Sequence, residues 1–181
     1  SLRAQVGYVA QKAHMFKGSI RSNICFGKPE ASDEEMHHAA RVAQASDFIS
    51  KRENGYLDEI AEDGTNISGG QKQRLSIARV ILKKPSLYIY DDSFSALDFK
   101  TDATLRKALK PEVEDAIFFV VAQRISTIMD SDMIIVLDEG QIIGLGTHLE
   151  LLKNCSVYQE IAHSQLTQKE LDDYGAPVRC S

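Results

Sequence analysis

Hydrophobic and polar residues follow two different periods along this chain, and each period predicts a different kind of element. Apolar residues spaced three or four positions apart are typical of helices. This spacing predicts helices beginning at Ser32 and spanning residues 45–51, 69–84, 101–110, 147–153 and 157–166. Ser32 and Glu35 form the capping-box pattern of a helix start, and Pro85 ends the helix over 69–84. In that helix we expect four apolar side chains to face inward and the basic ones outward: Leu75, Ala78, Val80 and Leu82.

Shorter apolar segments predict strands. Residues 5–11 alternate between apolar and polar or small side chains, whereas residues 86–92 and 116–122 are continuous apolar runs, as expected for strands buried on both faces. Residues 132–146 predict a hairpin around Glu139 and Gly140. The order of strands and helices predicts an α/β fold with a parallel sheet covered by helices, and with a helical insertion at roughly 28–80.

Composition narrows the class of function. The 181 residues carry a formal net charge of −5, which argues against nucleic acid or an anionic membrane surface as the main partner. The apolar runs are too short to cross a bilayer, so we expect no membrane span in this chain. The three cysteines are odd in number and widely spaced, which argues against a disulfide framework and a zinc site.

Ser68, Gly69 and Gly70 stand directly before the helix over 69–84. A hydroxyl and two backbone amides without side chains, placed at a helix N-terminus, can hold an anion with help from the helix dipole. The alternative is an ordinary N-cap serine with glycines beside it. Local physics alone leaves both interpretations open.

Two carboxylates, Asp91 and Asp92, end the apolar strand at 86–92. The carboxyl edge of a parallel sheet is where α/β proteins bind ligands. Asp91 could hold Mg²⁺, Asp92 could orient an attacking water, and Gln11 could supply a neutral oxygen ligand. The alternatives are a solvated strand end and an ordinary surface glutamine.

The order of these motifs resembles that of the ATP-binding-cassette (ABC) transporters, from about residue 3 to residue 153. Gln11 matches the Q-loop, which in that family contacts Mg²⁺ and couples to the membrane domain. Asp91 matches the Walker B carboxylate, and "SALD" matches the D-loop, so the resemblance implies a catalytic role for Asp98. The sequence "ISGGQ" matches the nucleotide-binding signature, with Ile where Leu is usual: Ile67, Ser68, Gly69, Gly70 and Gln71.

The resemblance implies a RecA-like P-loop NTPase core with an inserted α-helical signature subdomain. It assigns residues 1–27 and 81–165 to the core, 28–80 to the helical subdomain and 166–181 to a flexible tail. "LDEIAEDG" resembles the loop by which exporters, rather than importers, sense their coupling helices, and residues 134–152 resemble the exporter C-terminal segment.

Three departures refine the resemblance. No G-x-x-x-x-G-K-[ST] phosphate loop (Walker A) occurs, so the chain resembles a C-terminal fragment with an incomplete core. Asp92 replaces the catalytic Glu of the family, and Gln123 replaces its switch His. With a signature close to the family pattern, the chain therefore resembles the degenerate half of a heterodimeric multidrug-type exporter of Firmicutes.

Such a subunit is expected to use ATP and Mg²⁺, and to pair head to tail with a second ABC subunit. It is also expected to carry a transmembrane domain fused upstream, and to lie at the cytoplasmic face of the bacterial plasma membrane. The resemblance implies slow turnover at its own site, while its signature serves the ATP of the partner. Two alternatives are a soluble ABC ATPase, such as a DNA-repair or translation factor, and a regulatory module that binds nucleotide without hydrolysing it.

Overall fold

The computed structural model describes residues 2–167. They form two compact units, of which the first ends at Val121 and the second begins at Ala122. The strands of the first unit are β1 (Val6–Val9), β2 (Gly18–Ser19), β3 (Glu59–Ile60), β4 (Leu87–Asp91) and β5 (Ile117–Val121). Its helices are α1 (Leu2–Gln5), α2 (Ile20–Ile24), α3 (Asp33–Val42), α4 (Ser46–Ile49), α5 (Gly69–Lys83) and α6 (Phe99–Leu109). Its 3₁₀ turns are η1 (Cys25–Gly27), η2 (Gly55–Leu57), η3 (Glu62–Gly64) and η4 (Lys110–Glu112).

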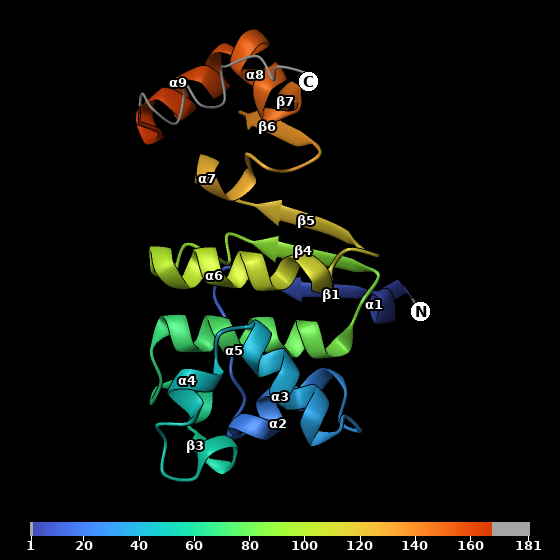
Figure 1. Cartoon of the computed structure of the whole chain (residues 1–181), viewed down its shortest axis with the longest axis vertical. Coiled ribbons are helices and arrows are strands. Elements are labelled where there is room, and N and C mark those ends of the chain that lie inside the picture. Colours follow the sequence, from blue (N-terminus) through green and yellow to red (C-terminus); the bar gives the residue numbers. More distant parts are fainter. Residues whose placement is uncertain (1, 168–181) are drawn as a thin grey trace, which may run out of the picture. The chain divides into compact units, whose positions relative to one another are not determined.

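The first unit is built around a parallel sheet in the order β1-β4-β5 (Figure 1). Strands β2 and β3 form a separate antiparallel pair. Tyr8 of β1 pairs with Ile89 of β4, which pairs with Phe119 of β5. Side chains in register share a face of the sheet. The predicted α/β class with a parallel sheet is therefore confirmed.

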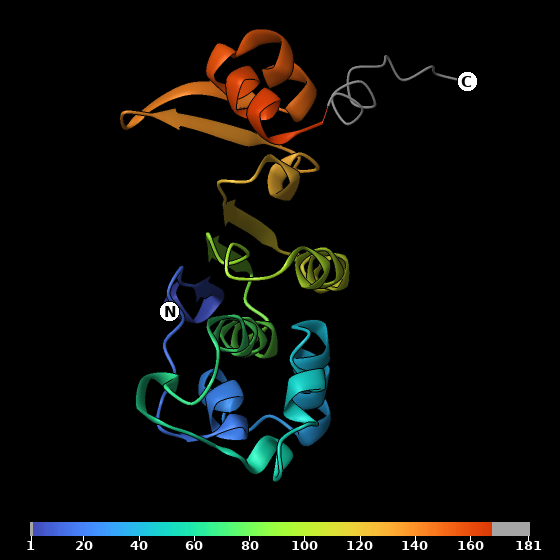
Figure 2. The ribbon, with the colours of Figure 1, turned by 90° about the vertical axis from the view of Figure 1, so that its left-hand side faces the viewer.

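The two faces of this sheet differ in burial. Tyr88 and Tyr90 lie on the covered face at 2% and 0% exposure, and Figure 2 shows α6 on one side of the strands. On the opposite face Ile117 is 68% and Phe119 48% exposed. The expectation of burial on both faces is therefore wrong for β5, since its side chains on this face are exposed.

The amphipathic helix at 69–84 is confirmed as α5. Leu75, Ala78, Val80 and Leu82 are buried, as predicted. Arg79 differs from the prediction of outward basic residues, because its guanidinium lies over the rings of Phe16 and Phe26, at 5.3 and 5.6 Å from their centroids. Its Nε also donates a hydrogen bond to the carbonyl of Asn23 at 2.9 Å. An arginine can pack its methylene groups and the face of its guanidinium against aromatic rings in this way, while its N–H groups still donate hydrogen bonds.

The second unit contains the predicted hairpin. It comprises α7 (Ile125–Ile128), β6 (Ile134–Asp138), β7 (Gln141–Gly146), α8 (His148–Asn154) and α9 (Ser156–Gln165). Strands β6 and β7 are antiparallel. Glu139 and Gly140 both have positive φ, 44° and 79°, as a two-residue hairpin turn of type I′ requires. The hairpin prediction is confirmed.

No helix within residues 2–167 is long and apolar enough to cross a bilayer. The domain boundaries at 27, 80 and 165 stay predictions. Most of the predicted tail, residues 168–181 with Cys180, lies outside the described residues.

Candidate functional site

Three segments of the first unit converge: the end of β1, the start of α5 and the end of β4. Parallel pairing of β1 and β4 places their carboxyl ends at one edge of the sheet. The Ser93 hydroxyl donates to the carbonyl of Val9 at 2.9 Å. Gln73 of α5, 1% exposed, donates its amide to the carbonyl of Ala10 at 3.1 Å. These buried side-chain bonds fix the backbone on which the predicted site residues stand.

The two adjacent acids are each held by a residue of the β1 segment. Asp91 is the last residue of β4, and the Tyr8 hydroxyl donates to its Oδ2 at 2.8 Å. Asp92 follows in a left-handed backbone conformation with φ of 43°, and the Gln11 Nε2 donates to its Oδ2 at 3.2 Å. Gln11 and Asp92, predicted separately, are thus brought together.

Tyr8 was not among the residues predicted for the site. Its hydrogen bond to the Asp91 carboxylate raises the pKa of the phenol above its ordinary value, because ionisation would place a second negative charge there. The sequence gives only part of the signal for this contact. Tyr8 stands three residues before Gln11, but nothing near it shows that its strand lies beside the one ending in Asp91.

The signature segment forms the N-terminal turn of α5 and is held by a capping box between Ser68 and Gln71. Ile67 is 9% exposed and anchors the turn in the core. The Ser68 Oγ accepts from the Gln71 amide at 3.3 Å, and the Gln71 Oε1 accepts from the Ser68 amide at 3.1 Å. A Cβ added at Gly69 would meet nothing within 4 Å. The turn is therefore open on the side of Gly69, where first-turn N–H groups have no carbonyl within the helix to bind.

The D-loop packs against this turn. A Cβ at Gly70 would approach the carbonyl of Ala96 to 3.3 Å, so glycine permits the close contact. Asp98 caps α6, since its Oδ1 accepts from the Thr101 amide at 2.9 Å and its Oδ2 from the Thr101 hydroxyl at 2.7 Å. These bonds lower the pKa of Asp98. Asp98 thus has a clear role as a helix cap, and its catalytic role stays a prediction.

The exporter-like loop at 58–64 is tied to the same helix. Lys72 of α5 donates to the carbonyl of Asp63 at 2.7 Å, and Asp63 has a positive φ of 55°. Gly64 follows at φ of 66°, a conformation that suits glycine. The loop and the signature helix are therefore in direct contact within the first unit.

Gln123, the predicted switch residue, belongs to the second unit. Its carbonyl accepts from the Gln165 Nε2 at 2.8 Å, and its side chain is exposed. Gln165 also accepts from the Ile125 amide at 2.9 Å through Oε1, which fixes the backbone at the start of α7. The role of Gln123 as a switch stays a prediction.

The donor set at the acid pair fits Mg²⁺ that arrives with a nucleotide. Asp91 and the amide of Gln11 provide hard oxygen ligands, which Mg²⁺ prefers. Within residues 2–167 no group of three or more His, Cys, Asp or Glu side chains is arranged to hold a metal. Mg²⁺ commonly needs only one or two carboxylates, because phosphates and water complete its shell.

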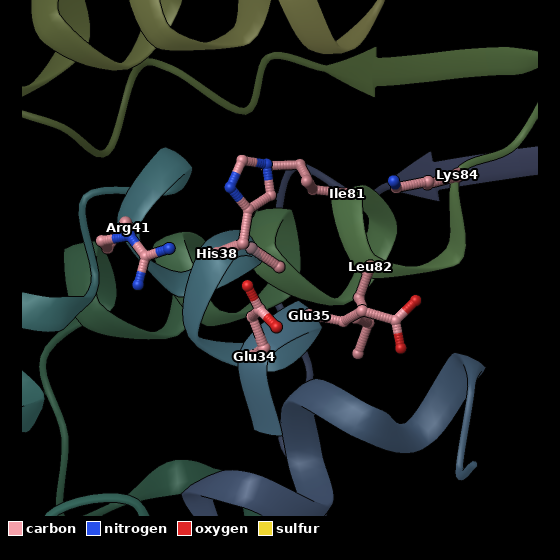
Figure 3. Close-up of a pocket in the computed structure, with 8 residues that line it drawn as sticks. Glu34, Glu35, His38, Arg41, Ile81, Leu82 and Lys84 are labelled. Atoms are coloured by element: carbon pink, nitrogen blue, oxygen red, sulfur yellow. The ribbon is translucent and has the colours of Figure 1, made fainter. Parts of the chain in front are cut away.

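A separate cavity of about 330 Å³ lies between α3 and the C-terminal end of α5 (Figure 3). Two carboxylates, Glu34 and Glu35, and two cations, Arg41 and Lys84, line it with His38. The opposite charges balance, so the cavity offers no net positive charge to a phosphate. The converging segments that carry the predicted site residues do not contribute to its lining.

This chain is similar to known ATP-binding proteins. The family described as ABC transporter matches residues 1–95. An uncharacterized ABC transporter ATP-binding protein of Bacillus subtilis, YfiB, is 43% identical over 91% of this chain and 28% of its own length. A second Bacillus subtilis protein, YgaD, provisionally named as a multidrug export ATP-binding/permease protein, is 46% identical over 89% of this chain and 28% of its own length.

A solved structure of a bacterial Atm1-family ABC exporter with ATP bound matches 92% of this chain and 29% of its own, with a TM-score of 0.88 and 37% identity. The chain thus spans about 28% of the length of the curated relatives it matches. The match to the family covers more than half of the chain, and the motif order, the parallel sheet and the signature turn agree with it. This chain belongs to the ABC transporter family, and its P-loop NTPase fold is that of the family's ATP-binding domain.

Proposed function

We propose that this chain is the nucleotide-binding domain of an ABC exporter, coupling ATP binding and hydrolysis to transport across a membrane. The similarity to an exporter with ATP bound supports this function, as does the contact between the exporter-like loop and the signature helix. The observation that carries the proposal is the signature turn, which is closed by its own capping box and open at Gly69.

The turn acts in trans. Two subunits pair head to tail, and the Ser68–Gly70 turn of this chain contacts the ATP held by a second ABC subunit. The side of Gly69 that its own chain leaves open is the side available to that phosphate. The whole protein carries a transmembrane domain and works at the cytoplasmic face of the plasma membrane, as the fused ATP-binding/permease organisation named for YgaD suggests.

The site on this chain turns over slowly. Asp91 and Gln11 would hold Mg²⁺, and that ion would supply charge stabilisation to the transferring phosphoryl group. Asp92 orients the attacking water, but it is one methylene shorter than Glu, and a misplacement of about 1 Å can cost about 10²-fold in rate. Gln123 can donate a hydrogen bond to the γ-phosphate but cannot become positively charged as His can.

The test compares the two halves of this proposal in the assembled pair of complete subunits. Asp92→Asn should change the total ATPase rate little, because the site it damages is already slow. Ser68→Arg should abolish most of the rate, because a long cation would fill the open turn of the competent site. Steady-state ATPase assays measure both effects, and equal losses from the two changes would contradict the asymmetric function.

Ser32→Arg is the matched control. Ser32 also closes a capping box, at the start of α3, and is exposed. Losing either cap costs about 0.5–2 kcal/mol of stability. A large ATPase loss in Ser32→Arg would attribute the effect of Ser68→Arg to helix capping rather than to nucleotide binding.

A non-hydrolysing regulatory module remains the second candidate, favoured by Asp92 and Gln123 for this chain's own site but not for the assembled pair. It predicts that the unmodified pair binds ATP with no measurable hydrolysis. Hydrolysis that depends on Ser68 would exclude it.

A further inference from the structure

The hydroxyl of Tyr8 contacts the carboxylate that the proposed function assigns to Mg²⁺. We propose that Tyr8 is a positioning residue, which holds Oδ2 of Asp91 and so restricts the orientation of the carboxylate that would bind the metal. The inference rests on the proposed function and adds to it a residue outside the motifs that the resemblance supplied.

The register of the sheet brings the two side chains together. Tyr8 pairs with Ile89 across the parallel strands β1 and β4, and Asp91 lies two residues beyond Ile89. Side chains two residues apart point to the same face of a strand, so Asp91 is the diagonal neighbour of Tyr8. A diagonal pair is within reach of a long aromatic side chain, and the observed distance between the Tyr8 hydroxyl and Oδ2 is 2.8 Å.

The backbone on both sides of this contact is fixed. Asp91 pairs in register with Val121 of β5. The fully buried Ser93 hydroxyl lies 2.9 Å from the Val9 carbonyl and 3.2 Å from the Asp91 carbonyl, so its single proton is shared between the two acceptors. The side-chain torsions of Asp91 are therefore the freedom that remains, and the bond from Tyr8 restricts them.

The chemistry of the donor matters as much as its position. A phenol donates a hydrogen bond without bringing a positive charge, so the carboxylate keeps the full negative charge that a divalent cation needs. Lys or Arg at the same position would compete with the metal. Gln11 holds Asp92 in the same way, through a neutral amide at 3.2 Å, so both acids are held by neutral donors from one segment.

Tyr8→Phe tests the inference, because it keeps the ring and removes the hydroxyl. The assay uses the complete gene product with its partner subunit and with ATP, and Mn²⁺ as the probe metal. Electron paramagnetic resonance measures the binding of Mn²⁺ without requiring turnover. We expect about tenfold weaker Mn²⁺ binding, in line with the loss of partners that orient metal ligands, and unchanged ATP affinity in the presence of a chelator.

Tyr56→Phe is the matched control, since Tyr56 is half-buried and lies outside the converging segments. It should leave Mn²⁺ binding unchanged. Unchanged Mn²⁺ binding in Tyr8→Phe would overturn the inference, and so would weaker ATP binding without metal, because that would indicate a general structural defect.

A double-mutant experiment tests whether Tyr8 acts through Asp91. In Asp91→Ala, which removes the acceptor, the effect of Tyr8→Phe should disappear, because contacting residues are non-additive when each change removes the same interaction. Equal losses in both backgrounds would show that Tyr8 acts through another route. Failure of the unmodified protein to bind ATP with Mn²⁺ would overturn the proposed function and this inference with it, whereas binding that is insensitive to Tyr8 would overturn the inference alone.

Discussion

The helices α3 and α5 begin with the same local structure but with different electrostatics. Each has an N-cap serine, Ser32 or Ser68, whose hydroxyl accepts from the backbone three residues on and whose amide is bonded in return. The returning side chain is the carboxylate of Glu35 in α3 and the neutral amide of Gln71 in α5. The first turn of α3 also contains Asp33 and Glu34, whereas the first turn of α5 contains no acid.

The difference separates two uses of one motif. Carboxylates in the first turn neutralise the positive end of the helix dipole, so α3 satisfies its N-terminus from within. Gln71 bonds the Ser68 amide equally well but leaves that positive end uncompensated. An anion from outside can then supply the missing charge. The neutral partner in the capping box is thus what distinguishes the helix start proposed to bind phosphate from the start of α3.

Gln71→Glu should have the largest effect, because it places a carboxylate in the capping box of α5, as in that of α3. A carboxylate facing a phosphate costs on the order of 1 kcal/mol or more, so we expect about a tenfold fall in the ATPase rate of the assembled pair. The helix itself should form normally, as circular dichroism would show. Glu35→Gln is the reciprocal control and should leave the rate unchanged, whereas full activity in Gln71→Glu would contradict the role assigned to charge at this turn.

Repair of the two departures from the family sharpens the comparison, because it changes residues outside the signature turn. Asp92→Glu and Gln123→His should each give little, and the double change should exceed the product of the two, because residues that act as a unit are non-additive. The assay is single-site turnover with the partner's own catalytic Glu silenced. If the partner's signature is intact and the double variant remains as slow as the unmodified site, these two residues do not cause the slowness.

The two capping boxes should contribute similarly to stability. Ser32→Ala and Ser68→Ala each remove one N-cap acceptor, and each should lower the free energy of unfolding by about 1 kcal/mol. Chemical denaturation measures this difference. A loss confined to Ser32→Ala would mean that the Ser68 box is strained in the absence of nucleotide.

The smallest expected effect is a pH dependence of the unfolding free energy. It should appear only for the Ser32–Glu35 capping box, which contains a carboxylate. The hydrogen bond from Lys28, followed by the bond from the Ser32 backbone, lowers the pKa of Glu35 from 4.5 to about 2. A lowered folded-state pKa means that the carboxylate stabilises the fold above about pH 4.5, and that this contribution is lost as the pH falls toward 2. The difference in unfolding free energy between the unmodified chain and Glu35→Gln should therefore shrink over that range. Gln71 does not ionise, so the Gln71→Ala difference should stay constant there.

Local features of this chain were predictable because the groups that decide them are close in sequence. Both serine caps, the inward face of α5 and the Glu139–Gly140 turn depend on residues within a few positions of one another. Helix α2 was missed because five residues show too little of a helical period, and β2 and β3 because each has only two residues. Short elements are defined by their tertiary neighbours.

Contacts between distant segments could not be predicted in the same way. Tyr8 and Asp91 are 83 residues apart, and their contact depends on strand order and register, which no single segment encodes. The position of Arg79 depends on two phenylalanines from another segment. The exposure of β5 was mispredicted because an apolar run shows what a strand prefers to bury and not whether both of its faces are covered. The strand ends and the motif resemblance both pointed to Gln11 and Asp92, but the hydrogen bond between them came from the fold.

The exposed apolar face of the parallel sheet should affect how strongly copies of the purified polypeptide associate. Tyr8, Ile117, Phe119 and Val121 present apolar surface there, each at least 46% exposed, and β5 is the last strand in the order of its sheet. Contiguous apolar surface next to an edge strand favours association between copies. We expect the apparent molar mass of the 181-residue polypeptide, measured by static light scattering, to rise with concentration. Phe119→Lys should reduce that rise, because it places a charge within the exposed apolar surface.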